Sequence, residues 1–252
     1  MSALSFPLSP EQCRRFAEEG YLVLPRMVDA ATCAQLREEA QAHVRHSPEP
    51  AEYEADVAYP GAPASRDAEG GRTVRRLLQA HARGPLFAAW LQDARVLGAV
   101  SQLLGGAVKQ ARAHHNCVMT KQPRFSSDTG WHRDVRYWAF TSHELVTSWL
   151  ALGREYPENG GLKVLPGTHT LTLPPEHYDA AQFLRPEVPE NAALIARSTD
   201  VRLEPGDVLL FHARLFHAAS RNHTAETKYS VVATYRRLDN LPKPGTRSAE
   251  RD

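Results

Sequence analysis

Three residues of the chain could together bind a metal ion through two imidazoles and one carboxylate. His132 and Asp134 stand two positions apart in GWHRDVRYW, and residues i and i+2 of a β-strand point to the same face. His217 ends the segment PGDVLLFHARLFH, which starts with a Pro-Gly turn and continues as an apolar strand pattern. Two histidines and a carboxylate on one face leave the opposite coordination positions open, as in non-haem Fe(II) oxygenases.

The His-x-Asp pair alone is a weak signal, because the chain has 12 histidines and 29 acidic residues. Both residues could instead be ordinary hydrogen-bonding groups at the surface. His212 is an alternative second histidine ligand, five residues before His217. Both segments lie among short aromatic and β-branched stretches that are typical of strands, and this pattern favours the metal-site interpretation.

Composition narrows the function classes. The 252 residues carry 30 Lys+Arg against 29 Asp+Glu, a formal charge of +1, which argues against nucleic-acid or membrane binding through bulk charge. No apolar run approaches the roughly 18–20 residues of a membrane span. The three cysteines are widely spaced and odd in number, which indicates a reducing compartment and a cytoplasmic location. Of the 30 basic residues, 25 are Arg and only five are Lys.

The elements expected to position these residues fall into two parts of a single domain, 1–252. Residues 1–106 read as mostly helical: a helix capped by Ser9 and ended by Gly20, a strand at 21–25, a helix from Asp29, and helical texture over 73–104. Between them, 47–71 reads as a long loop that could act as a lid. Residues 107–240 read as a β-core, with candidate strands at 113–120, 131–134, 145–152, 161–164, 198–203, 208–211 and 229–235. The expected fold is mainly β, a double-stranded β-helix (jelly roll, cupin-like) with N-terminal helices.

The chain resembles the phytanoyl-CoA dioxygenase-like family of Fe(II)/2-oxoglutarate oxygenases over most of its length. Four segments carry the resemblance in order: the opening LSPEQCRRFAEEGYLVLP with VDAATCAQLREEA, then GWHRDVRYW, ENGGLKVLPGTH and GDVLLFHARLFHAASRNHT. The resemblance implies Fe(II), 2-oxoglutarate and O₂ as cofactors, with His132, Asp134 and His217 as the metal ligands. By position in the last segment, His217 rather than His212 is the second histidine ligand.

The same resemblance implies a cation for the far carboxylate of 2-oxoglutarate. Family members usually have an arginine about eleven residues after the second histidine, and here that position holds Lys228. An ammonium can hold a carboxylate as a point charge but lacks the bidentate fork of arginine. Arg221 is the alternative anchor, and a solvated lysine at the start of a strand is the non-functional interpretation of Lys228.

Further residues are weaker candidates. Lys121 resembles a family lysine at a strand end near the cosubstrate, and strand alternation places Met119 and His115 on its face. Trp149 resembles a family tryptophan near 2-oxoglutarate, although burial in the core explains it equally well. Four residues are candidates for contacting the substrate, each with packing or a solvated face as the alternative: Tyr137, Trp138, His115 and Arg76.

The resemblance therefore implies an enzyme that oxidises a small organic substrate, most often by C–H hydroxylation, and releases succinate and CO₂. Two other classes remain open at this point. One is a cupin-like metalloenzyme, an isomerase or hydrolase that does not use 2-oxoglutarate. The other is a non-catalytic jelly-roll binding protein, against which the complete His-x-Asp…His set argues.

Overall fold

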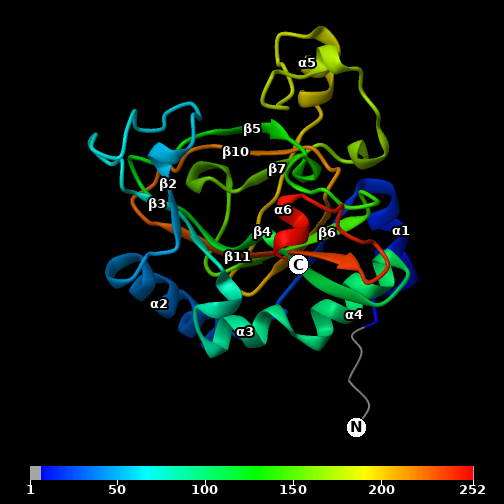
Figure 1. Ribbon diagram of the computed structural model, residues 1–252, viewed down its shortest axis with the longest axis horizontal. Coiled ribbons are helices and arrows are strands. Elements are labelled where there is room, and N and C mark those ends of the chain that lie inside the picture. Colours follow the sequence, from blue (N-terminus) through cyan, green and yellow to red (C-terminus); the bar gives the residue numbers. More distant parts are fainter. Residues whose placement is uncertain (1–6, 252) are drawn as a thin grey trace.

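Two antiparallel sheets form the body of the molecule in the computed structural model, which describes residues 7–251 (Figure 1). The larger sheet has the strand order β1 (Tyr21–Leu24), β9 (Val208–His212), β6 (Leu145–Ala151), β11 (Lys228–Arg237), β4 (Val108–Lys121), β3 (Val74–Leu78) and β2 (Ala51–Tyr53). The smaller sheet has the order β5 (Thr129–His132), β10 (His217–Ala219), β7 (Leu162–Val164) and β8 (Thr199–Asp200).

The two sheets face each other, as the upper and lower strands in Figure 1 show. The space between them is filled by apolar side chains from both sheets, among them Trp149, Phe211 and Val232 below and Leu162 and Val164 above. This sandwich of a seven-stranded and a four-stranded sheet confirms the expected jelly roll.

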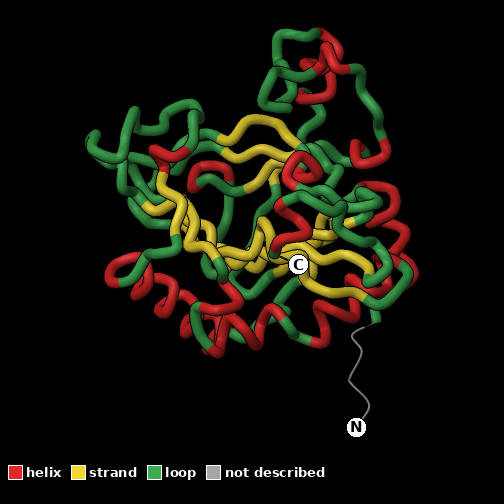
Figure 2. Tube along the Cα trace, viewed as in Figure 1, coloured by secondary structure: helices red, strands yellow, loops and turns green. Residues whose placement is uncertain are grey.

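Helices cover the outer face of the larger sheet (Figure 2). They are α2 (Ala30–His46), α3 (Pro85–Leu91) and α4 (Ala94–Leu104), and their apolar faces share one buried cluster with the sheet. The N-cap residue of α1 (Pro10–Glu19) is Ser9, whose side chain forms a capping box with that of Gln12. The C-cap residue is Gly20, which has φ of 80°. The predicted first helix and the strand that follows it are therefore confirmed.

The expectation of helix over 73–104 is wrong for its first part, because β3 occupies Val74–Leu78. Leu77 and Leu78 pair with Val118 and Cys117 of β4, so β3 satisfies the backbone groups along an edge that would otherwise be open. The expected loop at 47–71 is also partly structured, since β2 pairs with β3 and the 3₁₀ turn η1 (Glu54–Asp56) follows it. Edge pairing is a tertiary effect that local periodicity does not reveal.

A large bulge interrupts β4 opposite β11. Asn116 pairs with Ala233 and Ala111 pairs with the next residue, Thr234, so residues 112–115 have no partner in β11. His115 consequently has φ of +30°, a conformation that L-residues with side chains adopt at a cost. The bulge breaks the strand alternation of β4 at His115, whose side chain lies in the space between the sheets.

The remaining elements lie at the periphery. A lobe of the chain that includes η6 (Pro175–His177) and α5 (Pro189–Ile195) stands above the smaller sheet (Figure 1). The other short helices are η2 (Ala80–Ala82), η3 (Asp134–Tyr137), η4 (Pro157–Asn159), η5 (Thr168–Thr170) and α6 (Arg247–Glu250). None of the helices within residues 7–251 combines the length and apolar character needed to cross a bilayer.

Candidate metal centre and cosubstrate pocket

The pairing of β5 with β10 brings two histidines together. His132 and His217 are direct partners in this antiparallel register, so their side chains leave the sheet on the same face. Their ring centroids are 4.3 Å apart, and both residues are buried between the sheets. The sequence predicted His217 at the end of the strand that follows Pro205-Gly206, but that strand, β9, ends at His212 and His217 begins β10 of the other sheet. The register of β10 with β5 explains why the two rings converge.

Asp134 completes the group from the first position of η3, two residues after β5 ends at His132. The prediction that both residues lie on one strand is therefore wrong, and the turn into η3 brings the carboxylate to the histidines. Its Oδ1 lies 3.7 Å from His132 Nε2 and 3.5 Å from His217 Nε2, and the side chain has no exposed surface. One donor atom from each of the three residues lies within 4.8 Å of the others, which a single ion could bridge. Oδ1 of Asp134 has no hydrogen-bond partner among the described residues, so a buried carboxylate oxygen faces the two imidazoles unsatisfied.

The hydrogen bonds of the two histidines leave their Nε2 atoms available to a metal. His132 Nδ1 lies 2.9 Å from the carbonyl of Gly130, and His217 Nδ1 lies 3.1 Å from that of Leu215. Because a carbonyl only accepts, each Nδ1 must donate, and Nε2 then carries the lone pair. Burial, with His217 beside it, lowers the pKa of His132 well below its usual value, which favours the neutral form that binds metals. The donor set thus fits iron.

His212, the alternative ligand, faces away from this group. Its Nε2 lies 3.3 Å from a carboxylate oxygen of Glu144, and its Nδ1 accepts a hydrogen bond from the Arg214 backbone N–H at 3.0 Å. Both ring nitrogens are therefore engaged elsewhere. The geometry supports His217 as the second histidine of the site.

A cavity opens beside the triad, between the two sheets. Six of the residues that the sequence singled out line it together with the triad: Arg76, His115, Met119, Lys121, Trp149 and Lys228. The strand alternation expected for β4 is thus seen at Met119 and Lys121, whereas His115 reaches the cavity through the bulge. Cations from β3, β4 and β11 make this cavity suited to an anionic molecule.

Lys228 lies inside this cavity and is bonded to an acid that the sequence did not indicate. Its ammonium lies 3.1 Å from Oε2 of Glu155 and 3.1 Å from the hydroxyl of Ser230, and it stands 4.8 Å above the ring of Trp149. Lys228 and Glu155 are both almost fully buried. Glu155 comes from the loop after β6, where it forms an isolated bridge with Leu203. No periodicity or motif marks this glutamate, so only the tertiary structure could find it.

Lys121 stands directly opposite Lys228 in the pairing of β4 with β11. Its ammonium donates to the carbonyl of Ser127. Burial, reinforced by the nearby Arg75, lowers the pKa of Lys121 well below that of an exposed lysine. Two lysines therefore line this end of the cavity, and Glu155 lies behind Lys228 as its ion-pair partner.

Arg221, the alternative cosubstrate anchor, points to the surface. It forms a two-bond ion pair with Asp128, with Nη2 and Nε at 2.6 and 3.0 Å from Oδ2, and more than a third of its side chain is exposed. It does not line the cavity. Its backbone N–H also donates to Asp128, which fixes the loop after β10.

Replacing Arg221 with alanine should therefore leave the dissociation constant of 2-oxoglutarate unchanged within about twofold. The free energy of unfolding should fall by no more than about 1 kcal/mol, as for other exposed ion pairs. Equilibrium binding and urea unfolding check the two values. A tenfold loss of cosubstrate affinity would return the anchor role to Arg221.

The bulge of β4 builds a wall beside Asp134. Nδ1 of His115 lies 3.3 Å from Oδ2 of Asp134, and burial lowers the pKa of His115 to about 4, so its ring is neutral at pH 7. The ring of His114 stacks on that of Tyr137 with centroids 4.0 Å apart. Nε2 of His114 lies 3.0 Å from Nη1 of Arg76. Trp138 packs against Phe140 in a separate apolar cluster and does not line the cavity.

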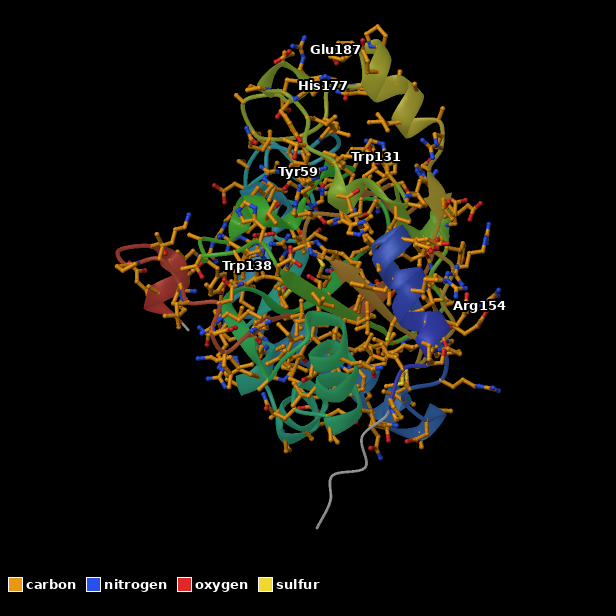
Figure 3. All side chains as sticks on the ribbon, turned by 90° about the vertical axis from the view of Figure 1, so that its right-hand side faces the viewer. Tyr59, Trp131, Trp138, Arg154, His177 and Glu187 are labelled. Carbon is orange, nitrogen blue, oxygen red and sulfur yellow. The ribbon has the colours of Figure 1, made fainter. Side chains whose placement is uncertain are left out.

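A groove on the surface leads toward the same site. It shares Thr129, Ala218 and Ala219 with the cavity, and its other lining residues come from the 47–71 segment, from the α5 lobe, and from β5, β7, β10 and η3 with their flanking loops. Tyr59 and Phe183 meet edge to face at its mouth, 5.5 Å between ring centroids, and Phe183 lies at the same distance from His132. Figure 3 shows Tyr59 and Trp131 below the lobe that carries His177 and Glu187.

The fold and the donor set define a jelly-roll protein of the mononuclear non-haem iron class. The chain belongs to the phytanoyl-CoA dioxygenase (PhyH) family, whose sequence profile matches residues 16–230. This confirms the expected family and, with it, the enzyme class: an oxygenase dependent on Fe(II) and 2-oxoglutarate.

Individual relatives are distant but cover most of the chain. An ectoine dioxygenase of Sphingopyxis alaskensis is 27% identical over 94% of this chain and 79% of its own. A probable phytanoyl-CoA dioxygenase of Caenorhabditis elegans is 25% identical over 90% of this chain and 75% of its own. The crystal structure of EctD from S. alaskensis with 2-oxoglutarate and 5-hydroxyectoine superposes with a TM-score of 0.75 at 21% identity, covering 96% of this chain and 80% of that one, which shows a shared fold.

Proposed function

We propose that the protein hydroxylates an unactivated C–H bond of a small organic molecule, with His132, Asp134 and His217 holding Fe(II). The observation that carries the proposal is the convergence of the two Nε2 atoms and an unsatisfied buried carboxylate oxygen on one point. The three ligands occupy one side of that point, and the cavity occupies the other. This arrangement leaves room for a chelating cosubstrate and for oxygen.

Four further residues of the cavity bind and orient the cosubstrate: Lys228, Lys121, Trp149 and Met119. The ammonium of Lys228 holds the far carboxylate of 2-oxoglutarate, with the amine of Lys121 opposite it as a second hydrogen-bond donor. Trp149 and Met119 line the cavity between these lysines and the triad and exclude water from it. When bound, iron and 2-oxoglutarate supply the oxidising power, and 2-oxoglutarate leaves as succinate and CO₂.

The substrate lies on the side of the triad that faces the β4 bulge and the groove. Arg76 and the neutral ring of His115 offer polar contacts there, and Tyr137 closes the wall behind them. Both relatives named above act, by their names, on small molecules, which agrees with a cavity closed in between two sheets. Trp138 supports the wall by packing rather than by contacting the substrate.

The three free cysteines support a cytoplasmic place of action. Cys13 is partly buried, whereas Cys33 and Cys117 are buried, and none is paired. A reducing compartment keeps such thiols free, and it also keeps iron in the Fe(II) form that the site requires.

Adding Fe(II) and then 2-oxoglutarate to the protein without oxygen tests the proposal. The expected result is the weak visible charge-transfer absorption of an iron–keto-acid chelate, saturating with one cosubstrate per chain. Replacing His132 with alanine should remove the absorption while the protein stays folded by circular dichroism. A zinc- or manganese-dependent isomerase or hydrolase would show metal-dependent turnover without oxygen and without succinate, and that result would replace the oxygenase proposal.

A further inference from the structure

An acid lies directly behind the lysine that is to bind an anion: Glu155 does not line the cavity but forms a buried ion pair with Lys228. Glu155 accepts hydrogen bonds from the Trp149 indole N–H at 3.1 Å, from the Ser230 hydroxyl at 2.6 Å and from the Lys228 ammonium at 3.1 Å. Three donors surround this buried carboxylate and satisfy its two oxygens, and one of them, the Lys228 ammonium, forms an ion pair with it. The positive charge of Lys228 is therefore already balanced by a fixed negative charge.

Lys228 nevertheless keeps capacity for another acceptor. An ammonium has three N–H donors, and two of them are accounted for by Glu155 and the hydroxyl of Ser230. Lys228 lines the cavity, so the third N–H is the one available to a bound molecule. Two acceptors on one ammonium are about 5 Å apart, given ordinary hydrogen-bond lengths and tetrahedral geometry.

The position of Glu155 is fixed from two sides. Its backbone N–H and carbonyl bond to Leu203 at 2.9 and 3.0 Å, and its side chain is held by the three donors. The group cannot turn away without leaving the indole N–H and the hydroxyl unpaired in a buried place, which is costly. A carboxylate bound by Lys228 therefore meets the repulsion of Glu155 as well as the attraction of the ammonium.

We infer that Glu155 is a specificity-determining residue for the cosubstrate, because it offsets the charge of Lys228. It lowers the affinity for 2-oxoglutarate and narrows the preference for this dicarboxylate over 2-oxo acids that lack the second carboxylate. The inference rests on the proposed role of Lys228 as the anchor. Because Glu155 weakens the advantage of the second carboxylate, the site should also accept 2-oxo acids with an uncharged far end. One such acid is 2-oxovalerate, in which a methyl group replaces the far carboxylate of 2-oxoglutarate.

The test compares the dissociation constants of 2-oxoglutarate and 2-oxovalerate in the Fe(II) protein, measured without oxygen by the chelate absorption. Glu155→Gln keeps the size of the side chain and removes its charge. We expect 2-oxoglutarate to bind about tenfold more tightly to this variant, because like charges about 5 Å apart repel strongly at the effective dielectric of a protein. The dissociation constant of 2-oxovalerate should change by less than about twofold.

Two further variants keep the result interpretable. Glu158→Gln removes the charge of an exposed acid three residues away and should change neither constant. Glu155→Ala should shift the selectivity in the same direction as Glu155→Gln, which covers the case in which the glutamine variant does not fold. Equal weakening of both 2-oxo acids would show a purely structural role and overturn the inference, as would weaker binding of 2-oxoglutarate alone. If the wild type binds no 2-oxoglutarate at all, the proposed function fails instead.

Discussion

Replacing His217 with alanine is expected to abolish metal binding and to lower turnover at least about a thousandfold. The metal contributes several kcal/mol of transition-state stabilisation in enzymes of this kind, and about 4 kcal/mol corresponds to that factor. Two ligands from β5 and η3 would remain, and His132 would lose the ring that faces it at 4.3 Å. Succinate formation coupled to substrate oxidation measures the turnover.

Thermal unfolding gives a readout that is independent of turnover. A metal present at a hundred times its dissociation constant stabilises the wild type by about 2.7 kcal/mol, which raises the Tm of a chain of this size by roughly 5–10 °C. The His217→Ala variant should show no such rise with Fe(II) or with redox-inert Zn²⁺. The Tm of this variant without metal should stay within a few degrees of that of the metal-free wild type. In the wild type, Oδ1 of Asp134 already lacks a hydrogen-bond partner within residues 7–251, so the substitution leaves no additional buried carboxylate unsatisfied.

His212→Ala provides the matched control, five residues away and equally buried. Its ring bonds to Glu144 and to the Arg214 backbone rather than to the triad. The variant should lose about 1–2 kcal/mol of stability and keep its metal-induced Tm rise. If His212→Ala loses the rise and His217→Ala keeps it, the second histidine ligand has been misassigned.

The parts of the site that follow from local chain geometry could be predicted from the sequence. The spacing of His132 and Asp134 and the family motif around His217 select the right three residues, although Asp134 lies in η3 and His217 begins β10 instead of ending β9. Local pattern alone does not explain why His132 and His217 meet, because that depends on the register of β5 with β10. The resemblance to the family supplied this pairing, and the structure supplied its physical reason.

The errors of the sequence-based prediction share one origin. Val74–Leu78 has the apolar residues of a short helix, yet it forms a strand because the open edge of β4 needs a partner. Glu155, for which no prediction was made from the sequence, is buried against Lys228. His115 reaches the cavity through a four-residue bulge that no alternation rule contains. In each case a contact between distant segments overrides the local pattern.

Replacing Lys228 with alanine is expected to weaken 2-oxoglutarate binding about 10- to 100-fold, the value of a charge-assisted hydrogen bond to a carboxylate. The same change leaves Glu155 buried without its counter-ion, which should lower the free energy of unfolding by about 3–5 kcal/mol. Affinity and stability therefore fall together in this variant, so the single substitution does not separate an anchor from a structural lysine. Equilibrium titration without oxygen and urea unfolding measure the two effects.

The double variant Lys228→Met/Glu155→Gln separates them. Both charges are removed and the volume is nearly kept, so the free energy of unfolding should return to within about 1–2 kcal/mol of the wild type. An anchoring role predicts that 2-oxoglutarate stays weakly bound in this stable protein, whereas 2-oxovalerate binds as it does to the wild type. Restored affinity for 2-oxoglutarate would show that Lys228 serves only to neutralise Glu155. The anchor would then be Lys121, the cation that faces Lys228 across β4 and β11.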